Sequence, residues 1–377
     1  MAGPISRQEV SLMYAFARAG LFALEPERAH HLTLSALARH ADLARRVYGR
    51  RVPSAPLELM GLRLANPIGL AAGLDKDGAC IDGLAAIGFG FLELGTVTPV
   101  AQPGNDRPRL FRLVDQRALI NRFGFNNDGV EALVARVRAA RFDGVIGINI
   151  GKNASTPADR AVDDYLACLE AVYDIASYVT INVSSPNTRG LRDMQSRENL
   201  DALLGSLVAR RDALAEARGR RLPLAVKIAP DMNDAALDGV AELLVRHRMD
   251  ALVATNTTTG RADLPLRWRN QAGGLSGVPV RARATEVIAA MHARLGEAVP
   301  IIGVGGIQSA QDALAKLEAG ASALQIYTGL IYRGPALIRE CAAAAAQWQA
   351  RRRVVAQAGV VSRDRAHATA AGRGSIR

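Results

Sequence analysis

Residues 181–188 read INVSSPNT, an apolar strand that runs directly into a cluster of small polar groups. The run from Tyr178 to Val183 is mostly β-branched and aromatic, which predicts a strand that is buried on both faces. Asn182 interrupts this run, and a buried amide must either bond to neighbouring backbone or face a ligand. Pro186 ends the strand and leaves Ser185 at its mouth. We therefore expect a functional site at the carboxyl end of this strand.

Similar apolar runs recur through the chain and alternate with helical patterns. The runs that can form buried strands are Pro67–Ala72, Phe91–Gly95, Gly144–Ile150, Tyr178–Val183, Pro223–Ala229, Ala251–Thr255, Pro300–Gly305 and Ala323–Tyr327. The helical segments between them include Val130–Ala140, Ala158–Ile175, Asn199–Arg218, Asp234–Arg248, Arg283–Leu295 and Gln308–Ala319. Eight strand and helix units predict an α/β fold, a closed (β/α)8 TIM barrel. Short runs at Leu57–Met60 and Leu62–Leu64 predict a hairpin that closes the bottom of the barrel.

The sequence divides into three expected parts: an N-terminal helical domain over 1–52, the barrel over 53–340, and 341–377, the end of the last helix with an Arg-rich tail expected to be disordered. Residues 10–22 are apolar, but Arg18 interrupts them and the run is shorter than the ~20 residues of a spanning helix. With the pattern from about Pro26 to Tyr48 it predicts two amphipathic helices that lie on a membrane surface. An ordinary helical cap on the barrel explains the same pattern equally well.

The net charge of +11 is concentrated at the two ends of the chain. Residues 1–52 carry +4 and residues 351–377 carry +6, which leaves +1 for the central body. This distribution favours an anionic lipid surface over a groove for nucleic acid, and solvated tails remain the alternative. The three cysteines, Cys80, Cys168 and Cys341, are too few and too scattered for a disulfide framework, an iron–sulfur cluster or a zinc site.

Amide side chains dominate the expected strand ends, where barrel enzymes place their sites. Asn149 and Asn182 lie near the ends of two expected strands, Asn256 follows a third, and Asn121 is expected in a loop. An amide offers both a donor and an acceptor, which suits a flat heterocycle such as a pyrimidine or an isoalloxazine. Lys227 lies inside an apolar strand, so its charge either faces a ligand that gains negative charge or pairs with a carboxylate that the sequence does not reveal.

Glycines follow the last two expected strands, in Gly303-Val304-Gly305-Gly306-Ile307 and at Gly329. Backbone N–H groups left free near helix N-termini after strands seven and eight hold a phosphate in many barrels. The segment 274–277 can join this cradle. FMN, a flavin that carries one phosphate, satisfies both the amides and the glycines.

The chain resembles the quinone-dependent (class 2) dihydroorotate dehydrogenases. The motifs that carry the resemblance are AAGLDKDG, GTVTP, NRFGFNN, GINIGKN, INVSSPNT, AVKIAP, ATNTT, GGLSG, IIGVGGI and QIYTG, which together span Met13 to about Ile338. The resemblance implies oxidation of (S)-dihydroorotate to orotate on one FMN per chain, with a membrane quinone as the electron acceptor, in de novo pyrimidine biosynthesis. It also implies a peripheral location on the cytoplasmic face of the bacterial inner membrane.

The resemblance also implies roles for individual residues. The cofactor-binding residues would be Ala72, Gly73, Lys76, Thr96, Asn149, Asn182, Lys227, Thr255, Gly277, Gly306, Tyr327 and Thr328. The substrate-binding residues would be Lys76, Asn121, Arg122, Phe123, Gly124, Phe125, Asn182, Asn187, Asn256 and Thr257. Ser185 would be the general base that removes the C5 proton while a hydride leaves C6 for flavin N5, and His30 and Arg112 would contact the quinone.

Ser185 is an unusual base, because a hydroxyl is a poor proton acceptor at neutral pH. From the residues alone it is equally a nucleophile or a hydrogen-bond donor, although His247 and His292 are expected on helix surfaces away from it. The soluble class 1 relatives have Cys at this position and lack the N-terminal helices, so both features favour a quinone user. Two rival classes are tRNA-dihydrouridine synthases, which need a basic rim and a catalytic Cys, and a lipid-binding scaffold, which leaves the amides unexplained.

Overall fold

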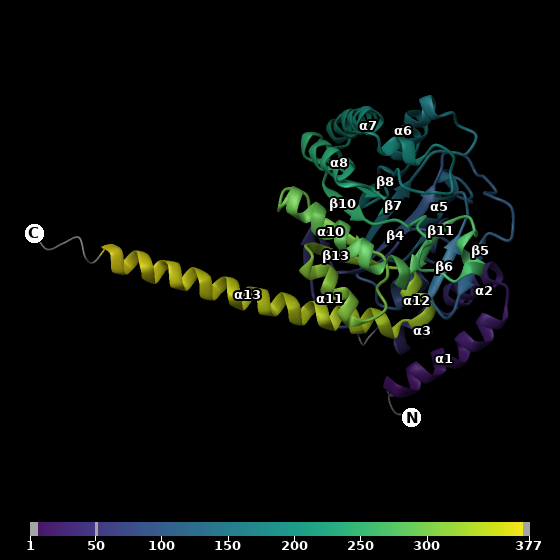
Figure 1. The fold of residues 1–377 in the computed structure, drawn as a ribbon, viewed down its shortest axis with the longest axis horizontal. Helices are drawn as coiled ribbons and strands as arrows, with labels where there is room; N and C mark the ends of the chain where they lie inside the picture. The colour runs from purple at the N-terminus through teal and green to yellow at the C-terminus, as the bar shows by residue number, and fades with distance from the viewer. Residues whose placement is uncertain (1–6, 50–51, 372–377) are drawn as a thin grey trace, which may run out of the picture.

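The computed structural model of the chain describes residues 7–49 and 52–371, with side chains described between 13 and 353. Eight parallel strands form a closed barrel in the order β3, β4, β7, β8, β9, β10, β12, β13 (Figure 1). Their bounds are Ile68–Leu70, Phe91–Val97, Val145–Ile150, Tyr178–Asn182, Leu224–Ile228, Ala251–Ala254, Ile301–Val304 and Ala321–Ile326. The eight strands expected from the sequence and the (β/α)8 fold class are confirmed.

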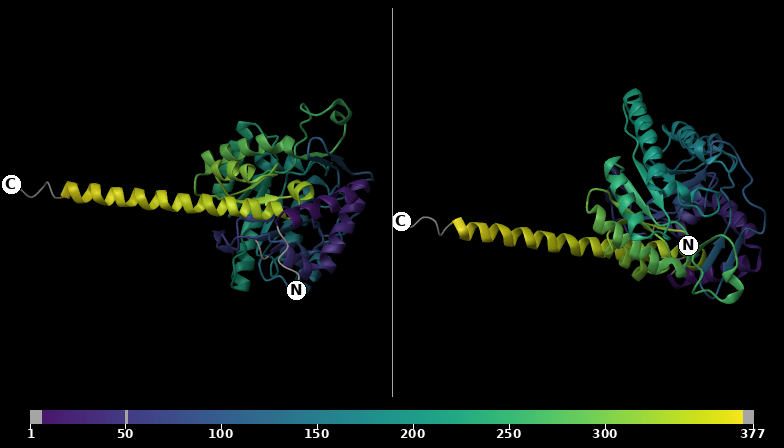
Figure 2. Two further views of the ribbon diagram at one scale, coloured as in Figure 1. Left: turned by 90° about the horizontal axis from the view of Figure 1, so that it is seen from below. Right: turned by 45° about the horizontal axis from the view of Figure 1, so that its top comes forward.

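Helices cover the outside of the barrel and shield its strands from water (Figures 1 and 2). They are α4 (Ile81–Ala86), α5 (Val130–Ala139), α6 (Ala161–Val172), α7 (Arg197–Arg218), α8 (Asp234–Arg246), α10 (Arg281–Leu295) and α11 (Ala310–Glu318). Shorter helical segments are η2 (Ala158–Arg160), η3 (Arg192–Gln195), α9 (Leu266–Arg269), η4 (Val278–Val280) and α12 (Thr328–Arg333). Alternate strand residues therefore pack outward under helices or inward in the barrel, which explains why the runs are apolar on both faces.

The predicted hairpin closes the bottom of the barrel. β1 (Leu57–Leu59) pairs with β2 (Leu62–Leu64) in the antiparallel sense. Leu59 and Leu64 are buried in the same apolar cluster as Phe91 and Tyr178, which extend inward from the barrel strands. The barrel interior is therefore filled by apolar side chains at this end.

A second small sheet lies beside the carboxyl end of the barrel and was not expected from the sequence. It consists of β5 (Leu110–Leu113), β6 (Ala118–Asn121) and β11 (Gly274–Gly277), all antiparallel. Asn121, expected in a loop, is the last residue of β6 and lies opposite Gly274. That expectation was wrong because each strand has four residues, and β6 pairs with a strand about 150 residues away.

The N-terminal part forms three helices, α1 (Arg7–Ala23), α2 (Pro26–Arg39) and α3 (Ala41–Val47), packed on one side of the barrel (Figures 1 and 2). The expected second helix is divided at His40, whose φ and ψ of −118° and 33° are not helical. Tyr14 of α1 donates hydrogen bonds to the carbonyls of Leu330 and Ile331 of α12, at 3.1 and 2.8 Å. The helices are therefore attached to the barrel by specific polar contacts.

Buried charges make a second attachment of the N-terminal helices. The Glu27 carboxylate on α2 is 2.7 Å from the Arg109 guanidinium, and both residues are buried. The side chains of Met13, Phe16, Leu32 and Leu43 on these helices are exposed to solvent, and Phe16 is 72% exposed. The helices thus combine a firmly held inner face with exposed apolar side chains.

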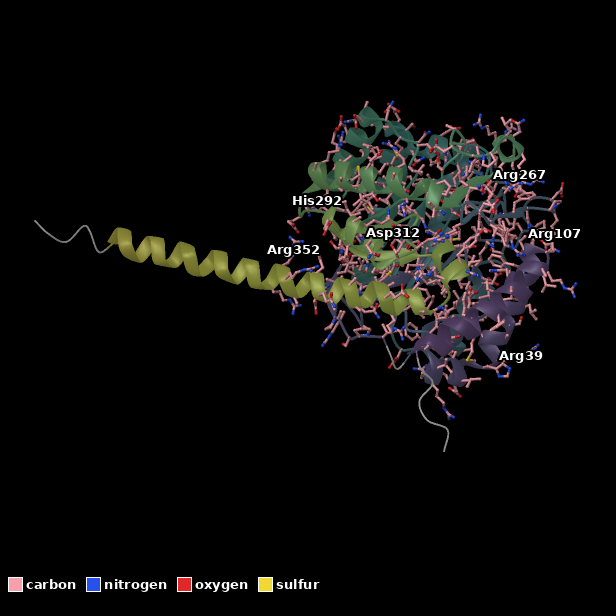
Figure 3. All side chains as sticks on the ribbon, turned by 60° about the horizontal axis from the view of Figure 1, so that its bottom comes forward. Arg39, Arg107, Arg267, His292, Asp312 and Arg352 are labelled. Carbon is pink, nitrogen blue, oxygen red and sulfur yellow. The ribbon has the colours of Figure 1, made fainter. Side chains whose placement is uncertain are left out.

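The last helix, α13 (Ala336–Ala371), packs on the barrel at its start and then projects away from the body (Figures 1 and 2). Its backbone extends into the Arg-rich end of 341–377 that was expected to form a disordered tail. The division of the chain into 1–52, 53–340 and 341–377 stays a prediction. Arg352 lies where the helix has left the body, with its guanidinium 4.9 Å from the Trp348 ring centroid (Figure 3). Within residues 7–49 and 52–371, no helix has the length and apolar character needed to cross a membrane.

Candidate active site

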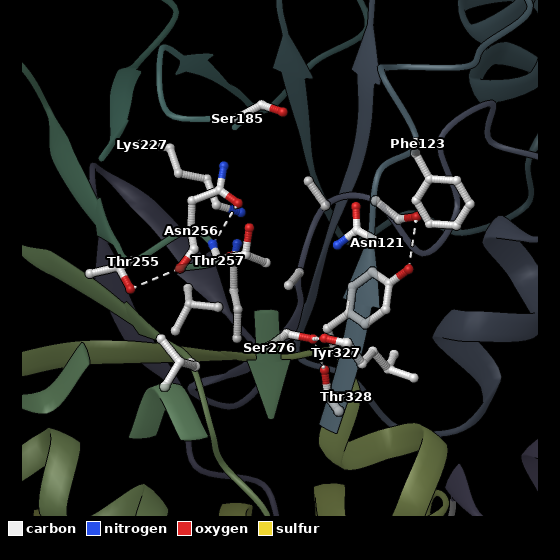
Figure 4. A pocket seen from close by; sticks show the side chains of 18 of the residues that line it. Asn121, Phe123, Ser185, Lys227, Thr255, Asn256, Thr257, Ser276, Tyr327 and Thr328 are labelled. Atoms are coloured by element: carbon white, nitrogen blue, oxygen red, sulfur yellow. Dashed lines mark hydrogen bonds between the residues drawn. The ribbon is translucent and has the colours of Figure 1, made fainter. Parts of the chain in front are cut away.

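A pocket opens at the carboxyl ends of the barrel strands, at the end opposite the hairpin (Figure 4). Its interior, including the opening to solvent, measures about 1050 Å³. The predicted site residues that line it are Ala72, Gly73, Lys76, Thr96, Asn121, Phe123, Gly124, Phe125, Asn182, Ser185, Asn187, Lys227, Thr255, Asn256, Thr257, Gly277, Gly306, Tyr327 and Thr328. The fold thus brings together residues from many strand ends.

Lys227 extends from β9 into this pocket (Figure 4). The side chain is buried, and no hydrogen bond or ion pair to its ammonium exists among the described residues. Burial lowers its pKa, and the carboxylate of Glu93 opposes that effect. An ammonium with no direct partner at the wall of a pocket is well placed to stabilise negative charge on a bound ligand.

A second lysine, Lys76, lies across the pocket on the loop after β3. Its ammonium is 4.0 Å from the centroid of the Phe123 ring, and the Arg109 guanidinium is 5.7 Å from the same centroid. Burial lowers the pKa of Lys76 to about 8, and the charge of Arg109 acts in the same direction. The site therefore holds a readily deprotonated ammonium that an anionic ligand would keep charged.

The amides form a connected row along one wall. Asn182 donates to Thr96 Oγ1 at 2.9 Å and to Asn149 Oδ1 at 3.1 Å, and its own oxygen accepts from Asn256 at 3.4 Å. Across the pocket mouth, Asn187 donates to Asn121 Oδ1 at 3.1 Å. Each amide has its orientation set by a neighbour, so the wall presents a fixed pattern of donors and acceptors.

Ser185 lies after β8 at the pocket wall and is 6% exposed (Figure 4). Its oxygen accepts a hydrogen bond from the backbone N–H of Asn187 at 3.2 Å. Among the described residues, no histidine bonds to it. His247 instead contacts Asp201 at 2.5 Å, so no serine triad is formed here.

The glycines after the last strands form a close-fitting cradle. Gly305, Gly306 and Gly277 have φ values of 113°, 75° and 89°, which favour glycine over other residues. A Cβ on Gly306 would lie 2.4 Å from Arg281 Cβ, and one on Gly277 would lie 2.3 Å from the Arg117 carbonyl oxygen. Because Gly305 and Gly306 follow β12 at the pocket wall, their backbone can approach a phosphate closely.

Four predicted residues do not line the pocket. Asn149 is fully buried behind Thr96 and Asn182. Arg122 directs its guanidinium to the Pro108 carbonyl oxygen at 2.8 Å. Two further residues, His30 and Arg112, lie at the N-terminal helices.

Burial lowers the pKa of His30 to about 3, and the charge of Lys76 acts in the same direction, so His30 is neutral at pH 7. Arg112 donates to the Leu24 carbonyl oxygen and lies 4.7 Å from the Phe22 ring centroid. Arg112 thus connects the helices with the barrel, and a quinone role for Arg112 and His30 stays a prediction.

Glu93 and Gln325 belong to the site region but were missed in the sequence. Glu93 is fully buried inside the barrel. Gln325 lines the pocket, and its side-chain amide donates a hydrogen bond to the Glu93 carboxylate at 2.7 Å. The signal was present, because Glu93 interrupts an apolar strand in the same way as Lys227. Its charge acts on Lys227 without a direct ion pair, so Glu93 is the carboxylate that the sequence does not reveal.

The closed barrel and its pocket define the molecule as a (β/α)8-barrel enzyme with its site at the carboxyl ends of the strands. The sequence pattern of the dihydroorotate dehydrogenase family matches residues 55–344. The chain belongs to the dihydroorotate dehydrogenase family, so the assignment made from its motifs is confirmed.

Relatives of this chain carry the name dihydroorotate dehydrogenase (quinone), which confirms the predicted branch of the family. The one from Burkholderia multivorans is 58% identical over 343 residues, covering 90% of this chain and 99% of the relative. The one from Herminiimonas arsenicoxydans is 57% identical over 337 residues, covering 88% and 97%. The crystal structure of DHODH from Eimeria tenella in complex with ferulenol is 34% identical with a TM-score of 0.77, covering 89% of this chain and 93% of that one.

Proposed function

We propose that this chain oxidises (S)-dihydroorotate to orotate on one bound FMN and transfers the electrons to a membrane quinone. The observation that carries the proposal is the pocket, which combines an unpaired buried ammonium, a row of oriented amides and a glycine cradle. A planar heterocycle with a phosphate and a planar anionic substrate together need these three features.

The pocket residues fit FMN. The Lys227 ammonium, buried without a direct partner among the described residues, suits a ring that gains negative charge, and the glycines, with positive φ values, present their backbone at the pocket wall, where it can approach a phosphate. FMN, when bound, supplies the acceptor for the hydride that leaves C6 of the substrate. The residues proposed to hold it at the pocket wall are Ala72, Gly73, Lys76, Thr96, Asn182, Lys227, Thr255, Gly277, Gly306, Tyr327 and Thr328. Asn149, which does not line the pocket, is proposed to act through Asn182, whose amide donates to Asn149 Oδ1.

The substrate is proposed to lie between Lys76 and the amides of the pocket mouth. Lys76 is suited to the carboxylate, because the anion offsets the cost of keeping the ammonium charged in a buried site. Asn121, Asn187 and Asn256 are suited to the ring N–H and C=O groups, since each amide both donates and accepts. The segment from Asn121 through Phe125, with Asn182 and Thr257, completes the proposed substrate site.

Ser185 is proposed to take the proton from C5 of dihydroorotate. Ser185 Oγ would pass its own hydroxyl proton to a water molecule as it takes the C5 proton, and the backbone N–H of Asn187, 3.2 Å away, would stabilise the negative charge that develops on this oxygen. Burial of Ser185 keeps bulk water away from the reacting groups. The side chain is thus held as an acceptor at the pocket wall, which favours the role of a base over that of a free hydroxyl.

The N-terminal helices are proposed to rest on the cytoplasmic face of the inner membrane and to admit the quinone. The exposed side chains of Met13, Phe16, Leu32 and Leu43 support an interfacial position. This chain covers 99% and 97% of the lengths of two bacterial relatives named dihydroorotate dehydrogenase (quinone). The ion pair between Glu27 and Arg109 would keep this entrance aligned with the pocket.

The substitution Ser185→Ala tests the proposal. The variant should bind FMN with the wild-type stoichiometry, because the hydroxyl is not part of the glycine cradle, and its flavin should be reduced by dihydroorotate at least ~100-fold more slowly. Stopped-flow absorbance of the flavin band under anaerobic conditions measures the rate. Wild-type rates of flavin reduction in the variant would exclude Ser185 as the base.

A further inference from the structure

Glu93 lies on β4 in the centre of the barrel, below the pocket, and it is 0% exposed. Tyr178 OH, Thr180 Oγ1 and Gln325 Nε2 donate to its Oε2 at 3.0, 3.1 and 2.7 Å. Asn149 Nδ2 donates to its Oε1 at 2.9 Å. An ionised carboxylate accepts hydrogen bonds on both oxygens and donates none, so these four donors suit it. Such a group is costly to bury and calls for a function beyond packing.

The bond from Asn149 determines which way that amide points. Because Asn149 gives its nitrogen to Glu93, its oxygen must face away, where it accepts from Thr96 Oγ1 at 2.5 Å and from Asn182 Nδ2 at 3.1 Å. Asn182 in turn presents its oxygen to Ser184 Oγ at 3.1 Å. The carboxylate thus sets the direction of the amide row that forms the pocket wall.

The same carboxylate acts on the charge of Lys227. Among the described residues, Glu93 is the carboxylate whose charge favours the protonated form of Lys227, against the effect of burial. No direct ion pair joins the two residues, so the ammonium remains available to a ligand while part of its charge is offset from below. Removal of Glu93 would leave a stronger positive potential at this wall.

We propose that Glu93 is a positioning residue of the flavin site. It acts through Asn149 to orient the amide row, and its negative charge offsets part of the positive potential that Lys227 exerts on the bound ring. This inference rests on the proposed function, because it requires FMN in the pocket. Without the Glu93 charge beneath it, the bound ring would lie in a more positive potential and would hold electrons more tightly. The Glu93 carboxylate therefore helps the reduced cofactor to pass its electrons on.

The test compares holoprotein of wild type and Glu93→Gln, which retains the shape and removes the charge. Sulfite adds to oxidised flavins, leaves a negative charge on the ring and bleaches the visible band, so its Kd measures the potential at the ring. We expect the sulfite Kd of Glu93→Gln to fall about tenfold at pH 7, equivalent to about 1.4 kcal/mol. The two-electron midpoint potential should rise by about 30 mV.

A matched control is Tyr178→Phe, which removes one donor to the same carboxylate and leaves every charge in place. Its sulfite Kd should stay within about twofold of wild type, since loss of one neutral donor costs little compared with loss of a charge. In a Lys227→Met background, Glu93→Gln should still lower the sulfite Kd by about tenfold, because the electrostatic potentials of separate charges add at the ring.

An unchanged sulfite Kd and midpoint potential in Glu93→Gln would overturn this inference alone, as long as dihydroorotate still bleaches the wild-type flavin. A wild-type protein that binds no FMN would overturn the proposed function as well. If Glu93→Gln does not fold, Glu93→Asp answers the same question, because it keeps the charge and withdraws it from Asn149 by one methylene group. Its sulfite Kd should remain within about twofold of wild type, and a tenfold change would contradict the electrostatic role.

Discussion

Binding of the anionic product should depend on pH through Lys76. Burial lowers the pKa of this ammonium from 10.5 to about 8, which corresponds to roughly 3 kcal/mol against the charged form. A bound carboxylate next to Lys76 would restore the charged form and raise its pKa again. The free protein therefore loses the proton as the pH rises through about 8, whereas the complex keeps it.

The sign and size of the effect follow from this difference. Above pH 8, orotate must bind together with a proton, so its affinity falls as the pH increases. At pH 9 the Lys76 ammonium is still charged in about one protein molecule in ten, so the orotate Kd should be about tenfold higher than at pH 7. Below pH 7 the affinity should be constant, because Lys76 is then charged with or without the ligand.

The assay is a titration of orotate into oxidised holoprotein, followed by the change in flavin absorbance between pH 7 and pH 9. Lys76→Met should bind orotate weakly and with no dependence on pH. Lys227→Met should retain the pH dependence, which separates the two lysines of the pocket. A wild-type Kd that stays constant from pH 7 to pH 9 would refute the reasoning.

Three further perturbations test the attachment of the helices, the cradle and the membrane surface. Glu27→Gln leaves the buried Arg109 guanidinium without its counter-charge and should lower the free energy of unfolding in urea by about 3 kcal/mol. Burial alone would raise the pKa of Glu27, but the hydrogen bonds and charge of Arg109 lower it below 4.5, so the wild type should lose this stabilisation as the pH falls below that value. Gly306→Ala places a Cβ 2.4 Å from Arg281 Cβ and should weaken FMN binding at least ~100-fold by fluorescence titration, whereas Gly239→Ala, with open space around it, should not. Phe16→Ser removes an exposed aromatic ring and should reduce sedimentation with anionic lipid vesicles by roughly tenfold, with unchanged flavin reduction by dihydroorotate.

The barrel was predictable because its strands are buried on both faces and leave continuous apolar runs such as 145–150 and 224–228. The three-stranded sheet of β5, β6 and β11 was not, since four-residue strands carry little periodicity and depend on distant partners. The break at His40 was also missed, because α2 and α3 continue the same amphipathic pattern across it. The local sequence pattern therefore predicts the elements that have a long apolar run or face of their own. It misses the short elements whose boundaries depend on tertiary contacts.

The site shows the same division. Lys227, Asn182 and Ser185 could be selected from the sequence because each interrupts or ends an apolar strand, and the structure places all three at one pocket. The carboxylate that acts on Lys227 could not be assigned, because Glu93 precedes it by more than one hundred residues and meets it only across the closed barrel. Which strand faces which inside a barrel follows from its closure, and no single segment encodes it.

The measurement that tests the central claim most directly is an anaerobic titration of the purified holoprotein with dihydroorotate. The account predicts a yellow protein whose flavin band is bleached by one equivalent of dihydroorotate, unaffected by NADPH, and restored when a water-soluble quinone is added. A protein that takes up no FMN, or a bound flavin that dihydroorotate leaves oxidised, would contradict the account.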